Sequence, residues 1–167
     1  KLDKFYVKIG YPNKWTDFSK LSIDPSKSYY ENVMACRKFA NDKEIAEKAG
    51  KPVDRDEWFM TPQTVNAYYN PTTNEICFPA GILQYPFFDP KADAAFNYGA
   101  IGVVIGHEMT HGFDDQGRQY DASGNLKDWW TAEDAEGFNK RADMYADFFS
   151  NIKVLPDLNA NGRFTLG

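Results

Sequence analysis

The spacing of apolar residues predicts three helices along the chain. Asp24 suits a helix cap and Pro25 the first helical position, and apolar residues then recur at three- and four-residue steps until Gly50 ends the helix. A second helix is predicted over residues 92–112, and a third begins at Thr131. The buried faces are expected to carry Tyr30, Val33, Met34 and Ala40 in the first helix, Ile101, Val104 and Ile105 in the second, and Phe138, Ala142, Tyr145, Phe149 and Ile152 in the third.

Three shorter segments predict a small sheet. Residues 5–12 alternate enough to form a strand that ends in a turn. Residues 64–69 and 75–78 are β-prone and flank the turn sequence Asn-Pro-Thr-Thr-Asn, so they predict a hairpin, after which residues 78–83 continue as irregular backbone. Together these elements predict an α+β domain with packed helices and a small mixed sheet.

Two local signals refine the helices. Gly99, Gly102 and Gly106 form a stripe of small residues, and each glycine weakens a helix by about 1 kcal/mol, so we expect another backbone to pack closely there. Thr131 and Asp134 have the spacing of a capping box, which predicts a defined start for the third helix.

Composition and charge limit the classes of function. The chain has 167 residues, 43% hydrophobic and 26% charged, which fits one globular domain or part of one. Its net charge of −5 argues against nucleic acid as a partner, because phosphate binding needs concentrated Lys and Arg. The most apolar run, residues 99–106, is far shorter than the roughly 20 residues that cross a bilayer, so no membrane segment is expected.

The ends of the chain predict a piece of a longer protein. The sequence begins at Lys1 without an initiator Met or an apolar signal segment, and it ends at Gly167 without a polar tail. Cys36 and Cys77 fit either a disulfide or two buried thiols, and we favour two free, buried thiols.

The sharpest chemical signal is the motif His-Glu-Met-Thr-His at residues 107–111. Positions four apart share one face of a helix, so His107 and His111 can reach a single cation. Glu108 lies beside the first ligand and is free to accept a proton from a metal-bound water. A chance patch on a solvated helix is the alternative, but the motif lies in a predicted helix and contains both histidines of the chain. The pattern therefore predicts a zinc site with Glu108 as general base.

Two histidines do not complete a catalytic zinc site, which normally has three protein ligands and a water. One class places a third His six residues after the second, and Gly117 at that position excludes this class. Another class uses a distant Glu, for which Glu133 and Glu136 are possible. Glu133 also suits the first turn of a helix, where an acidic residue interacts well with the helix dipole. The third ligand therefore stays open.

Asp114 and Asp115 follow His111 by three and four residues. A metal-bound histidine usually donates its other ring N–H to a carboxylate, which fixes its tautomer. Either aspartate could accept that bond, and the alternative for each is a solvated residue of a turn.

Three ordered blocks resemble the neprilysin and endothelin-converting-enzyme family of zinc metallopeptidases. They are HEMTHGFDDQGR at 107–118, VNAYYNP at 65–71 and ICFPAGILQ at 76–84. The resemblance implies that the whole chain is one fragment of a zincin-like (thermolysin-like) catalytic domain. Its parts would be a strand and long helix over 1–60, a substrate-edge hairpin and loop over 61–90, the zinc helix over 91–112 and a following helix over 131–152.

The resemblance also implies residue roles. His107 and His111 would bind one zinc ion, with Glu108 as general base. Asn66 and Ala67 would lie on an edge strand and hold the substrate backbone by hydrogen bonds, as suits an extended peptide. The hydrophobic pocket after the cleaved bond would be lined by Ile82, Phe87, Val103 and Val104, for which plain core packing is the alternative.

The implied activity is zinc-dependent hydrolysis of peptide bonds in oligopeptides, in an extracytoplasmic setting: periplasmic, surface-anchored or secreted. In the family the third zinc ligand is a Glu that directly follows Thr-Leu-Gly, found here at residues 165–167. The family's further Asp, His and Arg of the site and its helical lid would also lie beyond this chain. The alternative is a non-catalytic folded fragment that binds peptide or a partner without hydrolysis.

Overall fold

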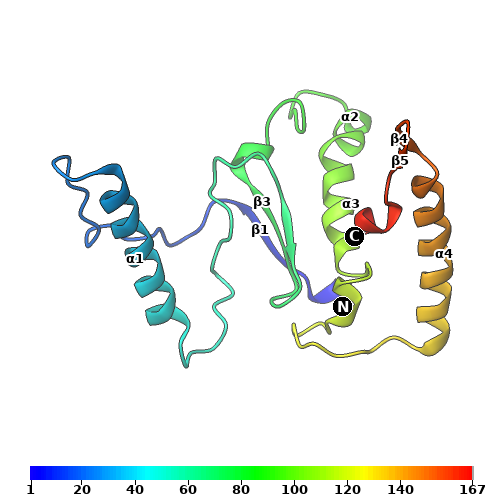
Figure 1. Cartoon of the computed structure of the whole chain (residues 1–167), viewed down its shortest axis with the longest axis horizontal. Coiled ribbons are helices and arrows are strands. Elements are labelled where there is room, and N and C mark those ends of the chain that lie inside the picture. The colour runs from blue at the N-terminus through cyan, green and yellow to red at the C-terminus, as the bar shows by residue number, and fades with distance from the viewer. Residues whose placement is uncertain (167) are drawn as a thin grey trace. The chain divides into compact units, whose positions relative to one another are not determined.

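A three-stranded sheet lies at the centre of the larger of two units (Figure 1). The computed structural model describes residues 1–166. The larger unit is formed by Lys1–Tyr11 together with the chain from Met60 onward, and the smaller unit is Pro12–Phe59. None of the helices in residues 1–166 has the length and apolar content that spanning a bilayer requires.

The sheet is mixed, as the sequence predicts. Strands β1 (Tyr6–Gly10), β2 (Tyr68–Asn70) and β3 (Glu75–Pro79) lie in the order β1-β3-β2, with β1 parallel and β2 antiparallel to β3. The predicted hairpin is confirmed, although β2 is shorter than expected. Every residue of β3 is buried, and β2 is an edge strand of this sheet.

One hydrophobic cluster joins the sheet to the helix that carries the metal motif. Ile101 and Val104 of α3 (Ile101–His111) pack with residues from the hairpin and from the loop after it. The packing buries one face of α3 and fixes its rotation relative to the sheet. The buried members are Ala67, Ile76, Phe78, Ile82 and Ile101, and Phe5, Tyr69, Leu83, Phe87, Phe88, Val104 and Met109 pack against them.

The single helix predicted over residues 92–112 is two helices. Helix α2 (Ala94–Gly99) ends at Ala100, whose φ of −106° and ψ of −94° are not helical, before α3 begins. The cause is a long-range hydrogen bond, because the Ile101 N–H donates to the carbonyl oxygen of Phe87 at 2.8 Å instead of continuing the helical ladder.

The expected close approach at the glycine stripe is wrong for the described residues. A Cβ built at Gly99 or Gly106 meets no atom within 4 Å, and at Gly102 the nearest is the Asn97 carbonyl oxygen at 3.4 Å. Helix α3 meets the sheet through its larger apolar side chains and not through Gly102 or Gly106, and Gly99 is the last residue of α2.

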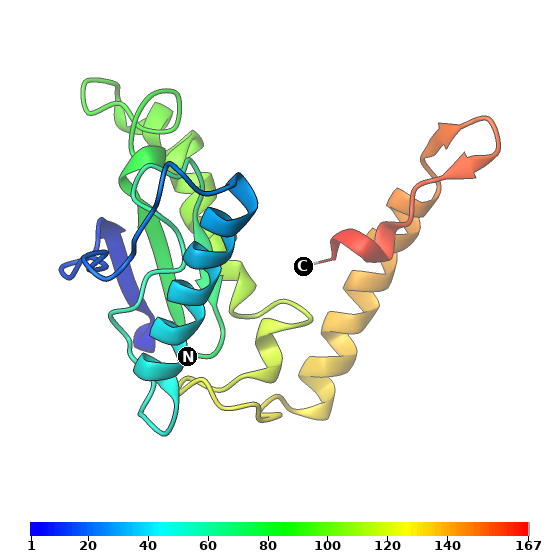
Figure 2. The same ribbon diagram turned by 60° about the vertical axis from the view of Figure 1, so that its left-hand side comes forward.

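The capping box at the start of the last helix is confirmed, but the predicted buried face is not. In α4 (Ala132–Ser150), Thr131 and Asp134 satisfy each other's backbone amides. Tyr145 is 55% exposed and Ile152 43% exposed, whereas Ala146 is buried. The partner of this helix is a short 3-10 helix, η4 (Gly162–Thr165), which returns along it after the small hairpin of β4 (Lys153–Leu155) and β5 (Leu158–Asn159) (Figure 2).

In the smaller unit, helix α1 (Tyr29–Lys48) begins later than predicted. Ser28 and Glu31 form a capping box, whereas the Asp24 carboxylate accepts hydrogen bonds from the amide and hydroxyl of Ser26 in a turn. None of the residues of α1 is buried, so the expected buried face is wrong for the described residues.

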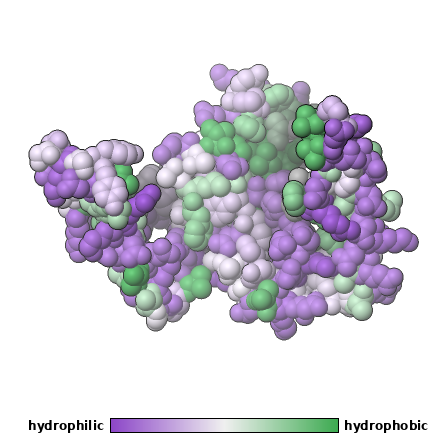
Figure 3. Space-filling view, viewed as in Figure 1, coloured by the Kyte–Doolittle hydropathy of each residue, from purple (hydrophilic) through white to green (hydrophobic). Residues whose placement is uncertain are grey.

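Figure 3 shows separated apolar patches on a mostly hydrophilic surface.

Both cysteines are free thiols in the described structure, as favoured from the sequence. Cys77 is buried in β3, and burial raises the pKa of its thiol to about 11. Cys36 is exposed on α1, which contradicts the expectation that both are buried.

A buried ion pair ties the three strands together. The Lys8 ammonium on β1 lies 2.8 Å from a carboxylate oxygen of Glu75 on β3, and the two side chains are 4% and 0% exposed. The other oxygen of Glu75 accepts a hydrogen bond from the Tyr68 hydroxyl on β2 at 3.2 Å. Each side chain is the oppositely charged partner of the other in this buried place.

We expect Lys8→Met to lower the free energy of unfolding by about 3–5 kcal/mol, because it leaves the Glu75 carboxylate buried without its cation. The double variant Lys8→Met with Glu75→Leu should recover most of that loss, since no uncompensated charge is left. Lys38→Met, which breaks an exposed pair with Asp42, should cost at most about 1 kcal/mol. Urea unfolding of the full-length protein measures all three, and equal losses in the single and double variants would contradict the role of the pair.

Candidate metal centre

The two histidines of α3 point their ring nitrogens at one another. Nε2 of His107 lies 3.0 Å from Nε2 of His111, and the two rings are edge to face with centroids 4.5 Å apart. The residues are one helical turn apart, so the helix itself creates this pairing. Both nitrogens therefore face one common point at the surface of α3.

Asp114 fixes the orientation of His111. One carboxylate oxygen of Asp114 lies 2.7 Å from Nδ1 of His111, and the other accepts the backbone N–H groups of Gln116 at 3.0 Å and Gly117 at 2.7 Å. The aspartate is buried. A carboxylate only accepts, so Nδ1 of His111 carries the proton and Nε2 is left with a lone pair.

Gly117 is required for this arrangement. A Cβ at this position would collide with the backbone carbonyl oxygen of His111, so only glycine lets the chain turn back against the end of α3. The close approach brings the Gly117 amide under the Asp114 carboxylate.

Asp115, the second aspartate predicted beside the metal, is placed differently. One of its oxygens accepts a hydrogen bond from the Gln116 side chain at 3.2 Å, and the other is buried without a hydrogen-bond partner among the described residues. The structure thus brings Asp114, and not Asp115, onto a histidine.

Glu108 lies on the side of α3 that faces the sheet. Its side chain is buried, and the backbone amide of Tyr69 on the edge strand β2 is one of the groups that act on its pKa. Burial raises the pKa of Glu108, while His111, His107 and the Tyr69 amide act in the opposite direction. A carboxylate with a raised pKa is a better proton acceptor.

The two histidine nitrogens are spaced about as two ligands of one zinc ion would be. Two nitrogen ligands on a tetrahedral zinc ion are about 3.3 Å apart, given Zn–N distances of about 2.0–2.1 Å, and the observed separation is 3.0 Å. Within residues 1–166, no group of three His, Cys, Asp or Glu side chains is arranged to hold a metal ion. Glu133 and Glu136, the candidates for a third ligand, lie in the first two turns of α4 and do not complete the pair.

Asn66 and Ala67 precede β2 instead of lying within it. The strand begins at Tyr68, and the Ala67 N–H just before it donates to the side-chain oxygen of Asn66 at 2.9 Å. Asn66 is exposed, whereas Ala67 belongs to the hydrophobic cluster. The segment still adjoins the edge strand β2.

The four residues predicted to line a hydrophobic pocket divide into two groups. Ile82, Phe87 and Val104 lie in or against the hydrophobic cluster, next to Ala67. Val103 is 62% exposed and lies on another face of α3. The structure therefore brings three of the four together.

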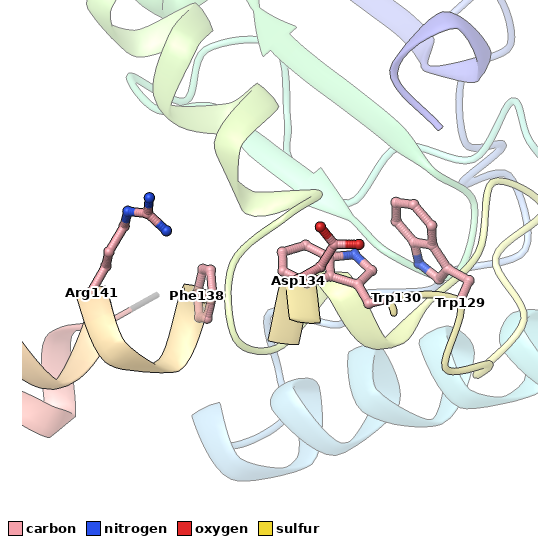
Figure 4. A pocket seen from close by; sticks show the side chains of 5 residues that line it. All are labelled: Trp129, Trp130, Asp134, Phe138 and Arg141. Atoms are coloured by element: carbon pink, nitrogen blue, oxygen red, sulfur yellow. The ribbon is translucent and has the colours of Figure 1, made fainter. Parts of the chain in front are cut away.

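One cavity among the described residues lies away from the predicted site residues. It has a volume of about 420 Å³ and contains none of the residues predicted for the site. Figure 4 shows Trp129 at one end and Arg141 at the other. Its remaining lining residues are Trp130, Asp134 and Phe138.

One residue that contacts the segment after α3 was not predicted from the sequence. Lys1 reaches the segment that follows α3 and contacts three of its carbonyl oxygens. A single lysine more than a hundred residues away in the chain gives no pattern that could have revealed this contact.

The chain is similar in sequence to known proteins. The model of peptidase family M13 matches residues 66–167. The chain is 45% identical over 174 residues to human endothelin-converting enzyme 1, an alignment that covers 100% of this chain and 22% of that protein. An endothelin-converting enzyme homolog of Locusta migratoria is 52% identical over 139 residues, which cover 83% of this chain and 19% of that protein.

Solved structures are similar to this chain in both fold and sequence. Zinc metalloprotease ZMP1 of Mycobacterium tuberculosis, in complex with an inhibitor, matches with a TM-score of 0.91 and 54% identity over 98% of this chain and 26% of its own. PEPO of Lactobacillus rhamnosis matches with a TM-score of 0.83 and 35% identity, also over 98% and 26%. These neighbours confirm the α+β fold.

The chain spans about a fifth of the length of the curated relatives it matches. Within that span the family model includes the hairpin, the metal-motif helix and the segment that holds Asp114. The resemblance seen in the three sequence blocks is thereby confirmed, and the chain belongs to peptidase family M13.

Proposed function

We propose that the protein containing this chain is a zinc-dependent metalloendopeptidase that cleaves oligopeptides. The observation that carries the proposal is the pair of imidazole nitrogens 3.0 Å apart, one of them on a ring whose tautomer Asp114 fixes. Membership of a peptidase family and the likeness to a zinc metalloprotease support it.

His107 and His111 would hold the zinc ion through Nε2. Zinc bound there supplies a Lewis acid that lowers the pKa of a bound water toward about 7 and polarises the scissile carbonyl. Asp114 keeps the His111 ring oriented and more basic. The third ligand expected from the family lies outside the described residues.

Glu108 would accept a proton from the attacking water and pass it to the leaving amine. Its position favours both transfers, because it lies next to His107 in the chain and is buried on the same helix as both histidines. Its burial keeps bulk water from competing for the proton.

The substrate would lie along the edge of the sheet. A peptide can pair with the outer edge of β2 as an added strand, which binds backbone with little dependence on side chains. Asn66 and Ala67 would extend that edge, provided the Asn66 side chain releases the Ala67 N–H. An apolar side chain of the substrate would be received near Ile82, Phe87 and Val104, with Val103 at the exposed rim.

The wider setting follows from the family resemblance alone. We propose that the chain is one part of a single zincin-like catalytic domain. We also propose that this domain works outside the cytoplasm on peptide substrates.

We expect Glu108→Gln in the full-length protein to retain zinc and to lower peptide hydrolysis by at least about 100-fold, since a general base contributes about 10²–10⁴-fold. Cleavage of a quenched peptide and the zinc content of the purified protein measure this. The control is Glu133→Gln, which should keep both activity and zinc. Near-normal activity in Glu108→Gln would refute the assigned base, and zinc loss in Glu133→Gln would identify an internal third ligand.

Asp114→Asn and Asp115→Asn form a matched pair of adjacent carboxylates. We expect Asp114→Asn to weaken zinc binding by about 10- to 100-fold, because His111 loses the carboxylate that fixes its tautomer. Asp115→Asn should leave the zinc affinity unchanged. Competition with a zinc chelator measures both affinities, and equal losses would show that the hydrogen bond to His111 is not what matters.

A further inference from the structure

The Lys1 side chain is bound on three sides by one short segment. Its Nζ donates to the carbonyl oxygens of Gly112 at 2.7 Å, Gly117 at 2.6 Å and Tyr120 at 2.8 Å. A lysine ammonium has three N–H donors, so these three contacts use all of them. The segment is residues 112–120, which directly follows α3.

Aromatic rings surround the same ammonium. Nζ lies 5.7 Å from the centroid of Tyr69, 5.8 Å from that of Phe113 and 6.0 Å from that of Trp129. These distances are within the range of cation–π attraction. Partial burial lowers the pKa of Lys1, and the nearby charges of Asp114 and Asp121 oppose that shift.

The main chain of Lys1 is also anchored. Its carbonyl oxygen accepts a hydrogen bond from the Asn74 side chain at 3.3 Å, at the turn of the β2–β3 hairpin. The lysine therefore connects the hairpin to the segment after α3, and it lies on neither of them.

The contact with Gly117 reaches the histidine in two steps. The carbonyl oxygen of Gly117 accepts from Lys1, and the N–H of the same residue donates to Asp114. Asp114 in turn accepts from Nδ1 of His111. Releasing the segment from Lys1 would loosen the amides that hold the aspartate in place.

We propose that Lys1 is a positioning residue of the metal centre, closing segment 112–120 so that Asp114 holds His111 in the orientation that binds zinc. This inference rests on the proposed function. It differs from a purely structural role, because removing the ammonium is expected to change metal affinity and not stability alone.

The test uses Lys1→Met in the full-length protein, with Lys4→Met as control, since Lys4 is exposed in the short 3-10 helix Leu2–Lys4. Hydrogen exchange of segment 112–120, measured on metal-free protein, should accelerate in Lys1→Met only. Zinc affinity should fall about 10-fold in Lys1→Met, at the lower end of the range for residues that orient a ligand. The absorption spectrum of the Co²⁺-substituted protein should change with it.

A double-mutant cycle with Asp114→Asn tests the route. If Lys1 acts through Asp114, adding Lys1→Met to Asp114→Asn should cost no further zinc affinity. Full additivity would overturn the proposal, as would faster exchange with unchanged zinc affinity, which is the signature of a structural role.

The proposed function can be refuted independently of the role of Lys1. A wild-type protein that bound no zinc would refute it, and the exchange measurement would still decide whether Lys1 holds the segment. Unchanged exchange in Lys1→Met would overturn the inference whatever the metal result.

Discussion

The packing of α3 against the β2–β3 hairpin is the constraint on which the site depends. Ile101 and Val104 bury one face of the helix in the hydrophobic cluster, and this fixes which residues face the sheet and which face away. Glu108 is thereby placed against the amide of Tyr69, while His107 and His111 present their Nε2 atoms to one point. A rotation of α3 would separate the base from the edge strand and turn the histidines with it.

Backbone N–H and C=O groups make most of the hydrogen bonds to the charged side chains of Asp114 and Lys1 near α3. Asp114 is bound by two amides and Lys1 by three carbonyl groups. Backbone groups persist through every substitution except proline, which lacks the N–H, and the local fold fixes their positions, so they hold a charge with little reorganisation. The Lys8–Glu75 pair inside the sheet works differently, since each side chain there depends on the other.

Local signals in the sequence predicted local structure well. The metal motif, the hairpin turn and the Thr131–Asp134 capping box all involve residues within a few positions of one another, and all are found. The predictions were wrong where the structure depends on groups distant in the sequence or on competing local interactions. The bond from Ile101 to Phe87 interrupts a helix that the periodicity made continuous. The start of another helix is set by a capping box at Ser28 and not by the expected cap at Asp24, and the Lys1 contacts have no sequence pattern at all.

The carbonyl oxygen of Tyr120 links this arrangement to an optical property. It accepts from the indole N–H of Trp129 at 2.9 Å as well as from Lys1 at 2.8 Å, and the ammonium lies 6.0 Å from the centroid of that indole ring. The excited state of an indole responds to a nearby cation and to the bond on its N–H. Trp129 is thus placed where its emission would respond to a change in the Lys1 contacts, alongside the emission of the chain's other three tryptophans.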